Sequence, residues 1–232
     1  MQQISPSLYQ IPLGGVNAFL LDSREDGLTL IDTGMPGSAE KIQKAVRDAG
    51  KDPRALRRII LTHAHTDHSG SAADLQQRLG IPVWAHAEDA LLVEEGVAGR
   101  KPMYLSPGWI NWLLYQLLIK RASPAIAPVK IDRRLTDGEL LPGGLRVIHT
   151  PGHSAGHISL LVENEGVLIA GDICAHFGGV NWSTLYEDRA LGRLSILKAA
   201  ALDYDQAVFG HGGVLRGRAN QRMRDKFTGA RI

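Results

Sequence analysis

Three histidines and one aspartate fall within six consecutive positions of this chain. They are His63, His65, Asp67 and His68, in the stretch 62–70. Imidazole nitrogens and carboxylate oxygens are ligands that suit zinc, and iron and manganese accept the same set. A polar surface turn is the alternative interpretation, but this density of ligands directly behind an apolar run favours a metal site.

The elements around this cluster predict where it lies. The run before it, residues 58–61, is apolar and β-branched and predicts a buried strand, and residues 69–79 have helical spacing. In an extended segment His63 and His65 point to the same side, so they can hold one ion. Asp67 and His68 follow as the chain turns and can face a second position nearby. The cluster therefore lies on a strand-to-helix turn, where loops commonly carry function.

The pattern His63-x-His65-x-Asp67-His68 resembles the signature of the metallo-β-lactamase-fold superfamily. Four more segments resemble the other motifs of that family, in the family's order: Leu30-Ile31-Asp32-Thr33-Gly34, Thr150-Pro151-Gly152-His153-Ser154-Ala155-Gly156-His157, Ala170-Gly171-Asp172 and Phe209-Gly210-His211-Gly212. The five motifs span most of the chain. The resemblance implies an α/β fold, a four-layer αββα sandwich of two mixed β-sheets flanked by helices, as a single domain over residues 1–232.

The resemblance also implies how seven side chains are shared between two divalent metal ions. The first ion would take His63, His65 and His153; the second would take Asp67, His68 and His211; and Asp172 would bridge them. A carboxylate has two oxygens and can bridge two cations, which a neutral imidazole cannot do. We expect zinc, with manganese or iron as alternatives.

Neighbouring residues have expected supporting roles. The resemblance places Asp32 beneath the metal loop, bonding backbone or a ligand histidine, although a helix or turn cap is an equal alternative. His157 is expected to bond the ligand loop, and Cys174 to be a small buried hydrophobe. In lactonase-like members of the family, a polar side chain shortly after the bridging aspartate reaches the substrate carbonyl. This makes His176 a candidate catalytic residue beside Asp67.

This ligand set predicts a hydrolase. Paired zinc ions lower the pKa of a shared water, so hydroxide is available near neutral pH to attack a carbonyl carbon. Asp67 would orient the hydroxide or pass a proton to the leaving group. Esters, lactones and thioesters fit this chemistry, in the style of lactonase- and glyoxalase II-like members. True β-lactamases of this fold differ at the bridging site, so Asp172 argues against a primary antibiotic-hydrolysing role.

Two functions of other classes remain open. A sulfur dioxygenase on the same fold would hold one iron on ligands of the His63, His153 and Asp172 type. The complete second ligand group argues against it. A non-catalytic metal-binding or partner-binding module would usually have lost a ligand, and none is missing here.

Composition limits the partners. The formal net charge of +2 gives no general case for nucleic acid or membrane. The chain has one cysteine, so no internal disulfide is possible and a reducing compartment is allowed. Residues 1–10 lack the pattern of a signal peptide, and no apolar run reaches the length of a membrane span. We therefore expect a cytoplasmic protein that acts on a small-molecule substrate.

The segment at about 89–129 departs from the alternation of strands and helices and predicts a helical insertion. Within it, residues 109–119 form an apolar helix that carries Trp109 and Trp112 and is too short to cross a bilayer. We expect a lid that offers an apolar wall to an acyl or aromatic group. A homodimer interface through this helix, or a plain core helix, are the alternatives.

Overall fold

The apolar runs of the N-terminal half form one mixed sheet in the computed structural model, which describes residues 1–120 and 125–230. Residues 121–124 of the expected insertion and residues 231–232 lie outside the described part. The strand order is β1-β2-β3-β4-β5-β6-β8, and the strands from β4 onward are parallel. Their bounds are β1 (Gln2–Gln3), β2 (Leu8–Pro12), β3 (Asn17–Asp22), β4 (Leu28–Ile31), β5 (Leu56–Ile60), β6 (Val83–His86) and β8 (Arg133–Leu135).

The C-terminal half supplies a second mixed sheet, of order β17-β16-β12-β11-β10-β9. Its bounds are β9 (Leu140–Leu141), β10 (Leu145–His149), β11 (Ile158–Val162), β12 (Val167–Ile169), β16 (Gln206–Val208) and β17 (Leu215–Arg216). β12 and β16 are parallel neighbours, whereas the hairpin β11–β12 is antiparallel. Two short ribbons complete the strands, β13 (Ala175–His176) with β14 (Val180–Asn181), and β7 (Tyr104–Leu105) with β15 (Leu185–Tyr186).

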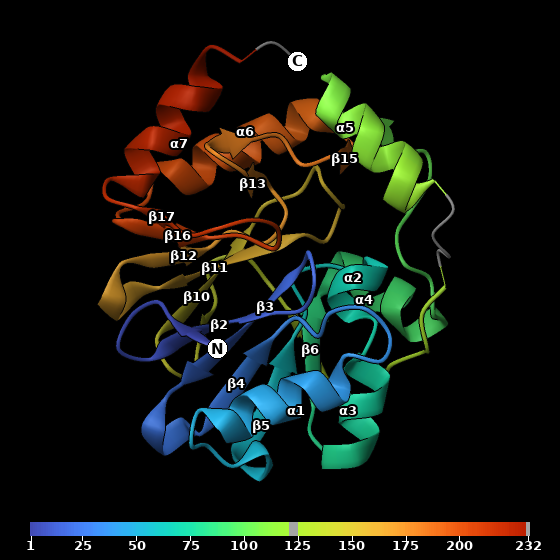
Figure 1. The fold of residues 1–232 in the computed structure, drawn as a ribbon, viewed down its shortest axis with the longest axis vertical. Coiled ribbons are helices and arrows are strands. Elements are labelled where there is room, and N and C mark those ends of the chain that lie inside the picture. The colour runs from blue at the N-terminus through green and yellow to red at the C-terminus, as the bar shows by residue number, and fades with distance from the viewer. Residues whose placement is uncertain (121–124, 231–232) are drawn as a thin grey trace.

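Helices cover the outer face of each sheet. The first sheet carries α1 (Ala39–Asp48) and α3 (Ala72–Leu79), and the second carries α6 (Arg189–Ala200) and α7 (Ala219–Thr228), as Figure 1 shows. The layers therefore run helix, sheet, sheet, helix, and the expected αββα sandwich is confirmed. Shorter elements are α2 (Thr66–Ser69), α4 (Ala87–Glu95), α5 (Trp109–Leu114), the π-helix η3 (Tyr115–Ile119), and the 3-10 turns η1 (Arg24–Asp26), η2 (Pro53–Ala55) and η4 (Glu163–Glu165).

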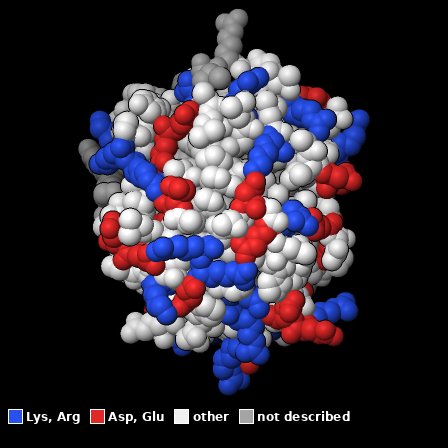
Figure 2. All heavy atoms as spheres, turned by 180° about the vertical axis from the view of Figure 1, so that it is seen from behind, with Lys and Arg blue, Asp and Glu red and all other residues white. Residues whose placement is uncertain are grey.

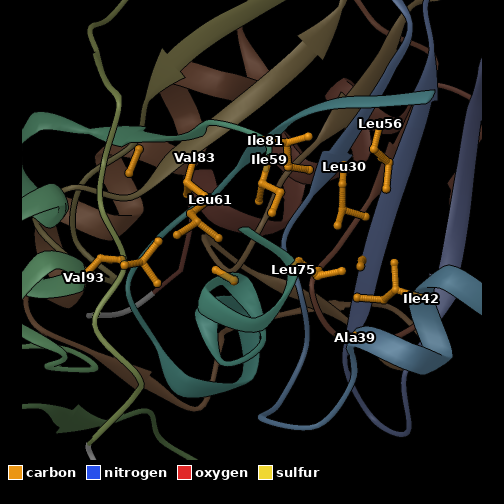
Figure 3. Packing of buried hydrophobic residues seen from close by; sticks show 14 of the residues in the cluster. Leu30, Ala39, Ile42, Leu56, Ile59, Leu61, Leu75, Ile81, Val83 and Val93 are labelled. Atoms are coloured by element: carbon orange, nitrogen blue, oxygen red, sulfur yellow. The ribbon is translucent and has the colours of Figure 1, made fainter. Parts of the chain in front are cut away.

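Three apolar clusters fill the spaces between these layers. Between the first sheet and its helices, Leu30, Ile59 and Val83 of the strands meet Ile42 of α1 and Leu75 of α3 (Figure 3). A second cluster lies between the two sheets, and a third lies under α6 and α7. Burial of each large apolar side chain contributes roughly 1.5–3 kcal/mol, so the facing pattern holds the layers together.

The strand ends bring the polar motifs to one region. β4 and β5 are parallel neighbours, so Asp32 and Thr62, which follow them, come out at the same edge. β12 and β16 likewise deliver Asp172 and His211 at one edge of the second sheet. Asp32 has a positive φ of 60°, a conformation in which a short polar side chain can still bond locally.

The expected insertion consists of two different parts. Its first residues belong to α4, where Ala90 and Val93 are buried in the core. In α5, by contrast, no residue is buried, and Trp109 is 74% and Trp112 54% exposed. The alternative that this helix belongs to the core is therefore wrong. Its apolar side chains have too little protein around them to be covered.

One face of the molecule carries mixed charge. Figure 2 shows basic and acidic side chains side by side over most of one face. Among the described residues, 1–120 and 125–230, no helix combines the length and the apolar character that crossing a membrane requires.

Candidate metal centre

Three histidines from two loops converge on one point. His63 and His65 follow β5, and His153 lies in the loop between β10 and β11. The Nε2 atom of His63 lies 3.0 Å from Nδ1 of His65. Nε2 of His153 lies 3.2 Å from the former atom and 2.9 Å from the latter. Three imidazole nitrogens held this close can surround a single cation, and we refer to them as the histidine group.

Asp67, His68 and His211 form a second set, which we call the aspartate group. The Nε2 atom of His211 lies 3.1 Å from Oδ2 of Asp67, and Nε2 of His68 lies 3.8 Å from the same oxygen. The ligand atoms of all three lie within 4.8 Å of one another. His211 comes from the second sheet and the other two from the first, so only the packed sandwich assembles this group.

The carboxylate of Asp172 faces both groups. Its Oδ2 lies 3.7 Å from Nε2 of His153, in the histidine group, and 3.2 Å from Nε2 of His211, in the aspartate group. Its Oδ1 lies 3.5 Å from Nε2 of His68. A side chain in this place can contact ions in both groups at once.

Backbone carbonyls orient two of the histidines. The Nδ1–H of His153 donates to the carbonyl of Leu185 at 2.8 Å, and that of His211 donates to the carbonyl of Gly15 at 2.7 Å. Because the outer nitrogen donates, Nε2 of each ring is the nitrogen that faces the centre. This is the usual way in which outer hydrogen bonds select the metal-binding tautomer.

Asp32 orients the other two imidazoles whose Nε2 faces the centre. Its Oδ2 accepts a hydrogen bond from Nδ1 of His68 at 2.8 Å and another from the hydroxyl of Thr62 at 2.8 Å. That hydroxyl lies 3.0 Å from Nδ1 of His63 and can accept its proton. Oδ1 of Asp32 also accepts the backbone N–H of Thr62. Asp32 thus bonds both backbone and a histidine, as the family resemblance implies, and is not simply a cap.

The two groups differ in the pKa values of their histidines. Burial lowers the pKa of His63 and of His153 well below the usual range, and the pKa of His65 is lowered for the same reason. These three rings are therefore neutral, with free lone pairs, at physiological pH.

The aspartate group behaves in the opposite way. Burial alone would lower the pKa of His68 and of His211, but the carboxylates of Asp172 and Asp67 outweigh it and raise both well above the usual range. Burial alone would raise the pKa of Asp67 and of Asp172, yet the neighbouring imidazoles hold both low. Without metal, this group therefore attracts protons to the place where a cation would bind.

Two further observations support the fit of these residues to bound metal. Nε2 of His68 and Oδ1 of Asp172 are buried and have no hydrogen-bond partner among the described residues. Leaving such atoms unsatisfied is costly unless they bind something. In addition, a Cβ at Gly210 would lie 2.1 Å from Oδ1 of Asp172 and 2.6 Å from Cε1 of His68, so only glycine fits beside these ligands.

His157 and His176, both predicted to act near the ligands, have different surroundings. Nε2 of His157 accepts the backbone N–H of Asp172 at 2.9 Å, and burial lowers the pKa of His157 to about 3, which keeps this acceptor neutral. Its expected bond to the ligand loop is thus present. His176 is half-buried: its Nδ1 donates to the carbonyl of Gly213, and its backbone N–H donates to the carbonyl of His211. Within residues 1–120 and 125–230, its other ring nitrogen has no hydrogen-bond partner.

Sequence reasoning missed three residues that support the ligands. Thr62 links Asp32 to His63, and its position just before the first ligand was a usable signal. Asp89 and Glu187 accept backbone N–H groups of the ligand loops from separate helices or their flanks. No local pattern distinguished them from ordinary acids near the start of a helix.

A model of the metallo-beta-lactamase superfamily matches residues 11–211 of this sequence. The chain belongs to this superfamily. Solved members share its fold. The metallo-beta-lactamase family protein TTHA1429 from Thermus thermophilus superposes with a TM-score of 0.71 at 25% identity, covering 96% of this chain and 79% of that one. The B3 metallo-beta-lactamase BLEG-1 also gives 0.71, at 26% identity, over 94% and 96% of the two chains.

Relatives in sequence include probable metallo-hydrolases and a hydroxyacylglutathione hydrolase. The uncharacterized protein YobT of Bacillus subtilis is 33% identical over 93% of this chain and 91% of its own. The probable metallo-hydrolase YflN of the same organism is 28% identical over 90% and 84%. The hydroxyacylglutathione hydrolase GloC of Haemophilus influenzae is 26% identical over 68% and 66%. This protein is thus a member of a metallo-hydrolase superfamily whose clustered histidines and aspartates could hold metal.

Proposed function

We propose that this protein is a dinuclear metal-dependent hydrolase that cleaves an ester, lactone or thioester with an apolar acyl group. The observation that carries the proposal is the position of Asp172, whose two oxygens face both the histidine group and the aspartate group. A mononuclear site would have no use for the second group. Bound zinc in both would supply Lewis-acid polarisation of the substrate and an activated water.

The protein's own side chains would handle the proton. Asp67 is one-third exposed, so it can be reached from the open side of the site. Its Oδ2 is 3.1 Å from Nε2 of His211, which fixes the carboxylate in place. We assign Asp67 to orient the attacking water and to pass a proton to the leaving group. We assign His176 to a contact with the substrate carbonyl, because it bonds the backbone of His211 and its Nε2 is not engaged by the described residues.

The insertion supports an apolar acyl group. The carbonyl of Leu185, in β15, accepts a hydrogen bond from Nδ1 of His153. Strand β15 in turn pairs with β7 of the insertion. Ser106, the residue after β7, donates a hydrogen bond from its hydroxyl to the carbonyl of Ser183 at 2.6 Å. Helix α5 begins three residues later. The pairing of β15 with β7 therefore connects the exposed apolar helix to a strand whose backbone contacts His153. We expect an acyl chain bound at the site to extend toward this helix.

Metal content and a substrate panel test the central proposal. We expect about two zinc ions per chain after dialysis without chelator, and hydrolysis of lactones, thioesters or aryl esters by the loaded protein, with a β-lactam as the comparison substrate. One iron per chain with oxidation of a thiol or persulfide would replace the hydrolase with the sulfur dioxygenase. No retained metal would favour the binding module.

The proposed acyl wall is tested separately by the double substitution Trp109→Ser/Trp112→Ser. Losing two exposed tryptophans should raise KM for a long-chain substrate about tenfold while kcat for its short-chain homologue stays unchanged. Leu194→Ser is the matched control, because Leu194 is 59% exposed on helix α6. If KM does not change and the double variant instead dissociates a dimer in sedimentation, then α5 is an interface between two copies of the chain.

A further inference from the structure

A buried carboxylate joins the two loops that carry the histidine group. Asp89, in the first turn of α4, is fully buried. Its Oδ2 accepts the backbone N–H of Ala64 at 3.1 Å and the hydroxyl of Ser154 at 2.7 Å. Its Oδ1 accepts the backbone N–H of Gly156 at 2.9 Å and Nη1 of Arg100 at 2.9 Å. Each oxygen thus accepts two hydrogen bonds.

The donors lie immediately beside the proposed ligands. Ala64 stands between His63 and His65, and Ser154 directly follows His153. A single oxygen of Asp89 therefore holds the loop after β5 and the loop after β10 at a fixed separation. That separation sets the distances of about 3 Å among the three ligand nitrogens.

Asp89 does not serve its own helix. The start of α4 is capped by His86, whose Nδ1 accepts the backbone N–H of Glu88. The four hydrogen bonds to the Asp89 carboxylate all come from residues outside α4. The fit is also specific on the other side, because a Cβ at Gly156 would lie 2.4 Å from the backbone nitrogen of Asp89 and 2.7 Å from its Cγ. A general interaction with the helix dipole would require neither feature.

The charge of Asp89 is balanced by Arg100, a later residue of the insertion. Arg100 pairs with Asp89, and its backbone N–H donates to Oε1 of Glu187 at 3.2 Å. Oε2 of Glu187 accepts the N–H of Ala155, in the His153 loop, at 2.8 Å. A buried carboxylate is strongly destabilising without such a partner, so the arginine is part of the same arrangement.

We propose that Asp89, supported by Arg100, is a positioning residue that fixes the geometry of the histidine group without contacting the metal. The inference rests on the proposed function, since it requires that this group bind metal. An amide at position 89 would turn its NH2 toward two of the four donors and force the loops apart. The three ligands would all remain, but their spacing would change.

The test compares Asp89→Asn with Glu88→Gln, an exposed carboxylate-to-amide change in the same helical turn. We expect zinc affinity, measured by competition with a chromophoric chelator, to fall by about 10–100-fold in Asp89→Asn and to stay unchanged in the control. The d–d absorption bands of the Co²⁺-substituted protein should also shift. Unfolding of the metal-free proteins shows how much of the effect is general destabilisation.

Wild-type affinity and an unchanged cobalt spectrum in Asp89→Asn would overturn the inference, as would a lower unfolding temperature with unchanged affinity. If that variant does not fold, Ser154→Ala removes a single bond to Oδ2 and should still weaken zinc binding several-fold. An unaltered affinity and spectrum in that variant would be equally fatal. Failure of the wild-type protein to bind zinc, manganese and iron alike would instead refute the proposed function itself.

Discussion

The two halves of the candidate metal centre differ in their electrostatics. In the histidine group, burial keeps His63 and His153 neutral, and their outer nitrogens donate to a hydroxyl and a carbonyl. In the aspartate group, carboxylates raise the pKa of His68 and of His211 well above the usual range. In the metal-free protein the histidine group therefore presents neutral nitrogens, whereas the histidines of the aspartate group hold protons that a bound metal ion would displace.

The difference shows what determines the metal affinity of each kind of cluster. A neutral cluster of imidazoles gains affinity from well-defined geometry, because it has no net charge to attract a cation. A cluster with carboxylates attracts any cation, including a proton, so its affinity depends on pH. Asp172 faces both halves, and in the proposed dinuclear site it would couple them.

The largest effect is expected from removing that coupling. Asp172→Asn keeps the shape but loses the charge that faces both groups, so turnover should fall on the order of 10³-fold and metal content should drop in both halves. Elemental analysis and circular dichroism check metal and fold together. Asp225→Asn, in the terminal helix α7, is the control. Full turnover in Asp172→Asn would remove the bridging role.

Single-ligand variants should separate the halves. The variant His211→Ala keeps the histidine group intact, and His63→Ala keeps the aspartate group intact. Each variant should therefore retain about one zinc ion. Because their pKa values are raised, His68 and His211 are protonated at neutral pH in the metal-free protein, and zinc uptake by His63→Ala should release roughly two protons. Uptake by His211→Ala should release almost none, because the pKa values of the histidine group are lowered.

Calorimetry in two buffers of different ionisation enthalpy measures these protons. The zinc affinity of the aspartate group should fall as pH decreases through the raised pKa values of its histidines. That of the histidine group should stay level from neutral pH down through the usual histidine range near about 6.5. Equal proton release in the two variants would abolish the contrast between the halves.

A smaller effect is expected at Asp32. Asp32→Asn places an amide where a carboxylate accepts from Nδ1 of His68 and from Thr62, so the orientation of His68 is weakened while all ligands remain. We expect the second zinc ion to bind about 10–100-fold more weakly and the first to change less. Chelator titration resolves the two steps. Equal weakening of both would mean that Asp32 acts on the whole loop through Thr62.

Much of the fold followed from local patterns. The buried strand expected over 58–61 is β5 (Leu56–Ile60). Residues 69–79, expected as one helix, are instead divided between the end of α2 and α3, with Gly70 and Ser71 between them. The apolar stretch 109–119 is helical, but its second half is a π-helix, and periodicity cannot distinguish the two.

The sequence by itself determined the donor chemistry and the family, because ligand types and spacings within each motif are local properties of the chain. Only the tertiary structure decided which donors meet and in which protonation state. His211 is held by the carbonyl of Gly15, 196 residues away, and the pKa values depend on burial between two packed sheets. The proposed role of Asp89 has the same origin, since one carboxylate can join two loops only after both sheets have packed together.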